Sequence, residues 1–460
     1  MGIRKLIGTK EFYKQALILA IPVFVQNLIT NFVSLLDNIM VGQIGTAEMS
    51  GVSIANTLIF VFNLCIFGGV SGPGIFSAQF HGKEDHEGVK NCLRYKLYFV
   101  IFITFLAILA CFFLYDPLIN LYLHDSNTEN VALTFNSARD YLFVMAFGLV
   151  PFAISNAYSG TLRETGQTQV PMRAGIIAVF VNLIFNYFLI FGNFGFPKLG
   201  VIGAAVATVL SRYVELLIVV IWTHKNRAEN RFIIGLYRSF KIPFSLLKDI
   251  TVKGLPLMLN ESLWSASVSM LVSLYSTRGL DVVAGLNIST TINNLFNVGF
   301  ISLGTVIAII VGNLLGAGKL KEAKEDAGKL IALTVVISTI IGIIAVISAP
   351  FFPLIYNTTE SVRKVATDVI LICAFMSPFH GFVNAAYFTI RSGGKTVITF
   401  LLDSAYEWAV TVPLTYILAY FTGIPIVPLY ILSQIPLVVK SVVAFILFKK
   451  GLWLNNLTEN

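Results

Sequence analysis

The sequence predicts an all-α polytopic membrane protein that crosses the bilayer many times. Three observations predict this class: 56% of the 460 residues are hydrophobic, only 12% are charged, and the mean hydropathy is +0.80. A soluble domain carries about 25% charged residues. Because a helix needs about 20 predominantly apolar residues to cross the hydrocarbon core, the long apolar runs are expected to be transmembrane helices.

Twelve apolar segments of sufficient length follow one another along the chain. They cover residues 13–41, 51–79, 95–115, 137–160, 170–192, 200–223, 253–277, 283–313, 328–349, 365–388, 397–421 and 425–448. The first is too long for the apolar region of a signal peptide, so we expect it to remain in the mature protein. The sequence therefore predicts twelve transmembrane helices.

Lysine and arginine concentrate in alternate loops. They are frequent before residue 15, between residues 83 and 96, from 224 to 253 and from 319 to 329, and scarce in the intervening loops. Because loops rich in Lys and Arg stay in the cytoplasm, we expect a multi-pass protein of the plasma membrane with both termini cytoplasmic. The formal net charge of +8 then reflects membrane orientation, and nucleic acid is not expected as a partner.

The two halves of the sequence repeat each other. A shift of 234 residues superposes Pro22 on Pro256, Gly45 on Gly279, Gly51 on Gly285, Asn63 on Asn297 and Gly82 on Gly316. A shift of 228 superposes residues 156–168 on 384–396. Such duplication is common in transporters. We therefore predict an N-terminal six-helix bundle over residues 1–223, a basic cytoplasmic linker over 224–252 and a C-terminal six-helix bundle over 253–460.

Several motifs in order resemble the multidrug and toxic compound extrusion (MATE) transporters. They are LxDxxxVGxxG around Asp37, LRETGQTQVPM after the fourth segment, GAAVAT in the sixth and GLPLMLNE at the start of the seventh. The resemblance implies two helical bundles in a V around a central cavity. It also implies export of amphipathic, often cationic compounds in exchange for protons or sodium ions. We expect a monomer in the lipid bilayer, without a cofactor.

Asp37 stands alone in the otherwise apolar first segment. An ionisable group at membrane depth is costly and usually has a partner or a function. The resemblance makes Asp37 the ion-coupling residue, with the amides of Asn182 and Asn186, and Thr208, as neighbours. Some relatives carry a second acid where Asn186 stands here. The structural alternative is a carboxylate that reaches the outer interface or forms a static pair.

Glu261 and His380 are the coupling candidates of the second half. Glu261 lies eight residues past Lys253, about 12 Å from the inner edge of its segment. Sodium-driven relatives add an aspartate where His380 stands here. Because sodium is expected to prefer oxygen ligands, whereas a carboxylate facing an imidazole can titrate near neutral pH, protons are favoured. Sodium at Asp37 or Glu261 stays a possibility, as does a merely hydrogen-bonded His380.

Polar residues form a stripe on the eighth segment. Asn287, Thr290, Asn294 and Asn297 are spaced by 3, 4 and 3 residues, which places them on one helical face. The second segment offers Ser53, Asn56 and Asn63 as counterparts. A polar stripe inside lipid must face protein or water, so both halves are expected to line a substrate cavity. Hydrogen bonding between helices is the alternative for each residue.

Two acids and one lysine lie at matching depth near the end of the chain. Asp403 and Glu407 are about 12 and 18 Å in from Lys395, and Lys440 is about 14 Å in from Lys449. An ion pair is the simplest account. The alternative places Glu407 in the substrate cavity, where it attracts cationic cargo.

The predicted function is a cation-coupled antiporter that exports small organic molecules. A lipid-linked saccharide flippase of the same superfamily is the alternative, although we would then expect more basic residues in the cavity to meet phosphate. An enzyme is not expected, since the five histidines form no HExxH or similar cluster. The four cysteines lack CxxC spacing, so a thiolate metal site is not indicated either.

Overall fold

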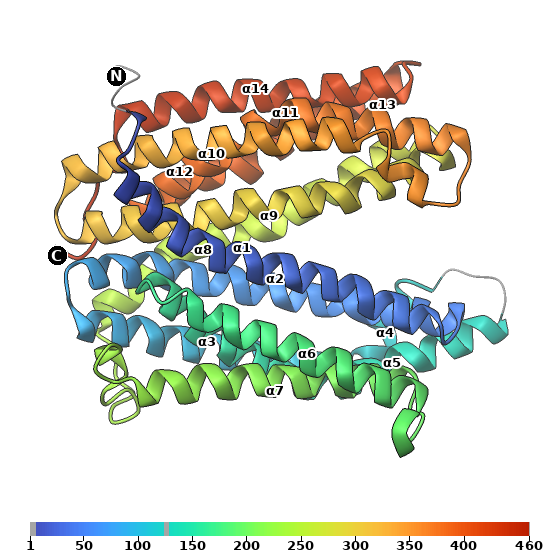
Figure 1. Ribbon diagram of the computed structural model, residues 1–460, viewed down its shortest axis with the longest axis horizontal. Helices are drawn as coiled ribbons and strands as arrows, with labels where there is room; N and C mark the ends of the chain where they lie inside the picture. Colours follow the sequence, from blue (N-terminus) through green and yellow to red (C-terminus); the bar gives the residue numbers. More distant parts are fainter. Residues whose placement is uncertain (1–5, 124–127, 460) are drawn as a thin grey trace. The chain divides into compact units, whose positions relative to one another are not determined.

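The computed structural model describes residues 6–123 and 128–459, and within these ranges it contains helices and no strand. The first half holds α1 (Lys10–Gly42), α2 (Thr46–Gly82), α3 (His86–Phe113), α4 (Tyr115–Asn120), α5 (Thr128–Glu164), α6 (Gln169–Phe191), η2 (Asn193–Gly195), α7 (Val201–Lys225) and η3 (Arg231–Ile233). Figure 1 traces these helices and those of the second half along the chain. The predicted all-α class is confirmed.

The second half contains the remaining elements. They are α8 (Phe244–Ser276), α9 (Leu280–Gly316), α10 (Leu320–Ser348), η4 (Phe352–Ile355), α11 (Glu360–Ser392), α12 (Thr396–Phe400), η5 (Leu401–Ala405), η6 (Glu407–Thr411), α13 (Val412–Phe421) and α14 (Ile426–Lys450). The elements η5 and η6 are π-helical, so α12 to α13 form one continuous rod with a widened middle. Each predicted transmembrane segment corresponds to a long helix or, for the eleventh, to this rod.

Within the described residues, eleven helices are long and apolar enough to cross a membrane. The other long helix is α8, which has 33 residues but carries Lys248, Asp249, Lys253 and Glu261. These charges lower its hydropathy without shortening it. The predicted number of twelve crossing helices is therefore consistent with the structure.

The helices pack into two compact units. Unit 1 contains the described residues up to Phe24, Ala78–Glu84, and the chain from Leu255 onward; unit 2 contains the described residues of Val25–Ser77 and Asp85–Gly254. The first turns of α1 and the last turn of α2 thus pack with the second half of the sequence. The basic segment 224–252 packs with the first half.

In unit 2, α5 packs against α3 and α7, and α6 packs against α7. The α6–α7 contact depends on Gly203, the glycine of the GAAVAT motif, because a Cβ there would overlap the backbone of Leu189. In unit 1, α11 packs against α9, α10 and α14. Its buried core includes Val306, Leu330 and Ala385.

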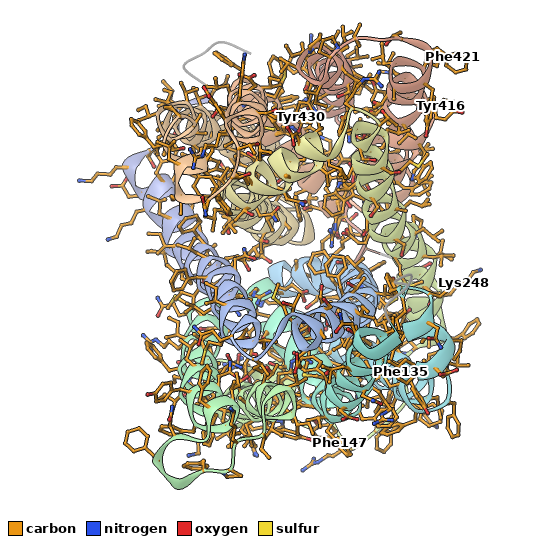
Figure 2. All side chains as sticks on the ribbon, turned by 90° about the vertical axis from the view of Figure 1, so that its right-hand side faces the viewer. Phe135, Phe147, Lys248, Tyr416, Phe421 and Tyr430 are labelled. Atoms are coloured by element: carbon orange, nitrogen blue, oxygen red, sulfur yellow. The ribbon has the colours of Figure 1, made fainter. Side chains whose placement is uncertain are left out.

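Large apolar side chains cover the outside of both units. Phe147 of unit 2 is 63% exposed, and Phe421 of unit 1 is 76% exposed. Figure 2 shows both side chains projecting away from their helices, together with Tyr416. Such surfaces suit hydrocarbon and its interfaces, where aromatic side chains are enriched.

The close α6–α7 packing yields a stability prediction. Gly203→Val places a side chain where the Leu189 backbone lies, and relieving that overlap should cost about 1–3 kcal/mol. The melting temperature in detergent should fall by several degrees. Gly423→Val is the control, because no atom lies within 4 Å of the added Cβ at Gly423. Equal melting temperatures for the two variants would contradict the packing account.

Candidate functional site

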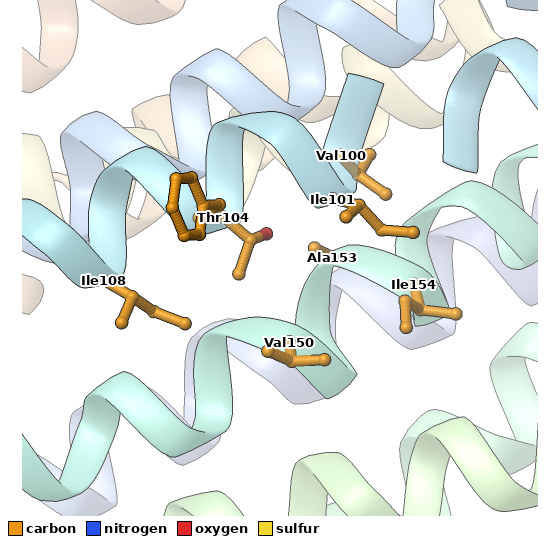
Figure 3. A pocket seen from close by; sticks show the side chains of 8 residues that line it. Val100, Ile101, Thr104, Ile108, Val150, Ala153 and Ile154 are labelled. Carbon is orange, nitrogen blue, oxygen red and sulfur yellow. The ribbon is translucent and has the colours of Figure 1, made fainter. Parts of the chain in front are cut away.

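The apolar notch between α3 and α5 is not a candidate site. It encloses about 190 Å³ and is lined by side chains such as Val100, Ile108 and Val150 (Figure 3). Thr104 supplies its hydroxyl, and no charged side chain lines the notch. Lipid chains can fill an apolar notch of this kind, and its lining offers no charged group that could bind an ion. The candidate functional groups therefore lie elsewhere.

The predicted neighbours of Asp37 do lie together, in unit 2. Asn186 donates from Nδ2 to Oδ1 of Asp37 at 2.5 Å and to Oδ1 of Asn182 at 3.2 Å. Asn182 donates in turn to Oγ1 of Thr208 at 3.2 Å. Both asparagines are buried, with 4% and 1% exposure for Asn182 and Asn186. Helices α1, α6 and α7 thus build one polar pocket around the carboxylate.

The charge of Asp37 has no cationic partner within ion-pair distance among the described residues. Its hydrogen-bond donor is a neutral amide, which solvates a carboxylate without compensating its charge. A partly buried charge of this kind is stabilised by a bound cation or removed by a bound proton. The pocket has the chemistry of a coupling site.

Tyr141 and Asn56 extend this pocket. Tyr141 is 6% exposed, and its hydroxyl contacts Asn56 and Thr208. Asp37 and Arg212 both act electrostatically on Tyr141. Asn56 therefore belongs to the Asp37 pocket as well as to the predicted cavity face. The sequence analysis missed Tyr141, although a tyrosine inside an apolar helix could have signalled it.

Asn63, the other cavity residue predicted on α2, is partly buried. Its Oδ1 atom is buried, and no described group hydrogen-bonds to it. The structure therefore does not bring Asn63 into the hydrogen-bonded chain that reaches Asp37.

In unit 1, Lys440 contacts both acids of the α12–α13 rod. Its Nζ lies 2.8 Å from Oδ1 of Asp403 and 3.2 Å from Oε1 of Glu407. Lys440 is 4% exposed, so the ammonium is held inside the unit. The ion pair expected from matching depth is formed. The two acids lie in the π-helical turns η5 and η6, a backbone form frequent at functional sites.

Asn260 joins α8 to this cluster. Its Nδ2 donates to Oδ2 of Asp403 at 3.0 Å and to the hydroxyl of Tyr387 at 3.4 Å. Its Oδ1 accepts from the hydroxyl of Ser404 at 2.8 Å. Asp403, rather than Glu407, is therefore the central acid, since it accepts from both Lys440 and Asn260. The sequence analysis did not predict Asn260 as a site residue, although its position directly before Glu261 could have indicated it.

Glu261 and His380, the coupling candidates of the second half, form no direct polar contact with each other in the described chain. No hydrogen bond or ion pair joins them in the described chain, and the charged groups that act on Glu261 are Arg391 and Asp403. The charged group that acts on His380 is Lys440. His380 is exposed, whereas Glu261 is partly buried. The expected pairing of Glu261 with His380 therefore stays a prediction, and Arg391 is the positive group that acts on Glu261.

The polar stripe of α9 forms an exposed face of unit 1. Asn287, Thr290, Asn294 and Asn297 are all exposed, while Ser289 and Ile292 on the other side of the helix are buried. Such a stripe is unfavourable against hydrocarbon. Its amides and hydroxyl are neutral, so the stripe can offer hydrogen bonds to a cargo without repelling a cation.

No group of three or more His, Cys, Asp or Glu side chains in the described ranges could hold a metal ion. The four cysteines are not disulfide-bonded to one another. The polar chemistry of the two units consists of carboxylates, amides, hydroxyls and buried bases.

Comparisons with known proteins relate the chain to a transporter family. A family model described as MatE matches residues 22–188 and 257–431, once in each half. A probable multidrug resistance protein NorM of Thermotoga maritima is 25% identical over 450 residues, covering 96% of this chain and 93% of that protein. A protein of the same description from Bacillus cereus is 26% identical over 412 residues and covers 89% of each chain.

Solved structures share the fold. One, described as the outward-facing conformation of a multidrug resistance MATE family transporter, superposes with a TM-score of 0.84 at 20% identity, covering 98% of this chain and 97% of that chain. At this identity, the likeness extends to the arrangement of helices and not to the chemistry of the sites.

The geometry of the lysine cluster predicts unequal effects of removing its acids. Glu407→Gln leaves Lys440 with Asp403, so stability should fall by only about 1 kcal/mol. Asp403→Asn removes the nearer charge and leaves one acceptor oxygen where Lys440 and Asn260 now use two, and it should cost about 3–5 kcal/mol. Thermal unfolding of the purified variants in detergent measures both. A larger loss for Glu407→Gln would show that Asp403 is not the central acid.

Proposed function

Because the chain belongs to the MatE family of membrane transporters, we propose that it exports small organic molecules by antiport with protons. Transport by alternating access requires that the coupling ion and the cargo bind differently to two states of the protein. The observation that carries the proposal is the Asp37 carboxylate, which accepts a hydrogen bond from a neutral amide and has no ion-paired base in the described chain. Binding of one cation there compensates a partly buried charge.

The composition of the two sites favours a proton over sodium. A sodium ion must replace its water ligands with protein oxygens. The amide nitrogen of Asn186, rather than an oxygen, points at Asp37. In unit 1, the oxygens of Asp403 already accept from Lys440 and Asn260, and Arg391 is a positive charge beside Glu261. A proton needs one carboxylate oxygen and no coordination shell.

The proposed cargo is an amphipathic molecule, often cationic. The α9 stripe offers neutral hydrogen-bonding groups along an exposed face. It carries no base that would hold a phosphate, so it does not favour the lipid-linked saccharide alternative. Glu407 is only partly engaged by Lys440, at 3.2 Å, and is the acid of unit 1 best placed to attract a positive charge.

The proposed setting is the plasma membrane, with both termini in the cytoplasm, and the proposed assembly is a monomer. The distribution of Lys and Arg among the loops supports this orientation. We further propose two six-helix halves joined by the basic segment 224–252, which the matching of the family model to each half supports.

Asp37→Asn tests the coupling role. The amide keeps the shape of the side chain but cannot exchange a proton, so gradient-driven export should fall to background while the protein still inserts and folds. Uptake of a fluorescent organic cation into proteoliposomes, at matched protein amounts, measures this. Asp249→Asn is the control, because Asp249 is an exposed acid of the same unit. Undiminished transport by Asp37→Asn would exclude Asp37 as the coupling residue.

The identity of the coupling ion can be tested in the same vesicles. A proton gradient at fixed sodium should drive the cargo against its own gradient, whereas a sodium gradient at fixed pH should have little effect. Since no hydrogen bond or ion pair joins His380 to Glu261 in the described chain, His380→Asp should leave this preference unchanged. Transport driven by sodium alone in the unmodified protein would refute proton coupling.

A further inference from the structure

The segment after α14 folds back onto the ends of other helices in unit 1. Trp453 is fully buried, stacks on Phe448 with ring centroids 5.7 Å apart, and donates from Nε1 to the Phe448 carbonyl at 3.1 Å. Gly393 makes this possible, because a Cβ there would overlap the Trp453 carbonyl. The segment Gly451–Glu459, which we call the return segment, is therefore a packed part of the unit.

Gln79, at the end of α2, is the centre of the contacts made by the return segment. Its side chain is fully buried. Nε2 donates to the carbonyls of Ser392 at 2.8 Å and Asn455 at 3.3 Å, and Oε1 accepts from the backbone nitrogen of Leu457 at 2.6 Å. Four residues on, Lys83 donates to the carbonyl of Thr458 at 2.5 Å. The last turn of α2 and Lys83 are thus hydrogen-bonded to the return segment at Asn455, Leu457 and Thr458.

Beneath these bonds, α2 and α9 cross at very close range. A Cβ at Gly82 would overlap the carbonyl of Asn313, and a Cβ at Gly316 would overlap the carbonyl of Gln79. The shift of 234 residues that relates the two halves converts one of these contacts into the other. The crossing is therefore symmetric between the repeats. Asn456 of the return segment contacts it by donating from Nδ2 to the Gly316 carbonyl at 3.3 Å.

The return segment differs from the segment after α7 in the first half, which packs against α3 through a hydrogen bond of 2.9 Å from Nε of Arg94 to the Leu236 carbonyl. The return segment binds one partner of the symmetric crossing, α2, through its last turn. The rest of α2, up to Ser77, belongs to unit 2. A contact that holds only the last turn of such a helix can be released without unfolding the helix.

We propose that the return segment is a latch that keeps the α2–α9 crossing closed. The crossing lies at the end of the bundle that the Lys and Arg pattern assigns to the cytoplasm. The latch rests on the alternating access proposed above, in which this end opens for cargo entry while the opposite end closes. Release of the Gln79 and Lys83 contacts accompanies the opening. The return segment therefore sets the balance between the two states.

Hydrogen exchange tests the latch without depending on the coupling ion. A chain that ends at Leu454 retains the Trp453 packing and loses the contacts of Asn455, Asn456, Leu457 and Thr458. Amide exchange in residues 78–84 and 313–318 should accelerate about fivefold or more, as expected from losing hydrogen bonds. Exchange in the turns at residues 43–45 and 277–279, at the other end of the helices, should slow. Lys324→Gln, an exposed residue of α10 outside the return segment, is the control.

A second variant separates a latch from packing. Gln79→Met keeps the length of the side chain and removes its bonds to Ser392, Asn455 and Leu457, so it should reproduce both changes in exchange. Faster exchange at residues 78–84 with no slowing at the opposite turns would mean that the segment only packs locally. Faster amide exchange at both ends of the helices, in both variants, would mean that the return segment supports the folding of the whole unit. Either result, or no change, overturns the proposal, whereas failure of proton-driven transport alone would not.

Discussion

The hydrocarbon core of a bilayer offers a polar side chain no water, and this constraint determines where the buried charges of this protein lie. Lys96 is fully buried and meets Glu164 at 2.5 Å and Thr161 at 3.0 Å. Lys440 is held by two carboxylates. Asp37 differs, because the described chain gives it an amide and no base. A charge that is solvated but not neutralised can bind and release a cation, and the proposed transport depends on this difference.

The duplication has preserved the backbone features of the halves more than their chemistry. The shift of 234 residues retains Pro22 as Pro256 and Gly82 as Gly316, where helices bend or cross closely. The same shift places Asp37 on Leu271, which packs in an apolar cluster of unit 1. It also places Asn27 on Glu261. Each half therefore carries its own acid at a different position, and the two pockets are not copies of one site.

Most of the fold could be predicted from the sequence, because length and hydropathy determine which segments cross a bilayer. The pocket of Asp37 could also be predicted, since family motifs placed Asn182 and Asn186 near it. Depth along a helix correctly paired Lys440 with the acids of the eleventh segment. The family resemblance predicted that Glu261 and His380 face each other, but no hydrogen bond or ion pair joins them in the described chain, because a residue's position along a helix does not determine which way its side chain points.

Other features had no signal in hydropathy or motifs. The π-helical turns around Asp403 and Glu407 depend on how this rod packs, and they interrupt an otherwise regular helix. The division of α1 and α2 between the units reflects tertiary contacts rather than a loop. The polar return segment gives no indication in sequence that Gln79, nearly 380 residues away, is its main partner.

The central claim is that Asp37 couples the binding of cargo to the release of a proton. Calorimetric titration of a cationic cargo into the purified protein, in buffers of different ionisation enthalpy at one pH, measures this directly. The observed enthalpy should vary linearly with the ionisation enthalpy of the buffer, with a slope that reports proton release on binding, and Asp37→Asn should abolish the slope. A slope of zero in the unmodified protein, with cargo bound, would contradict the account.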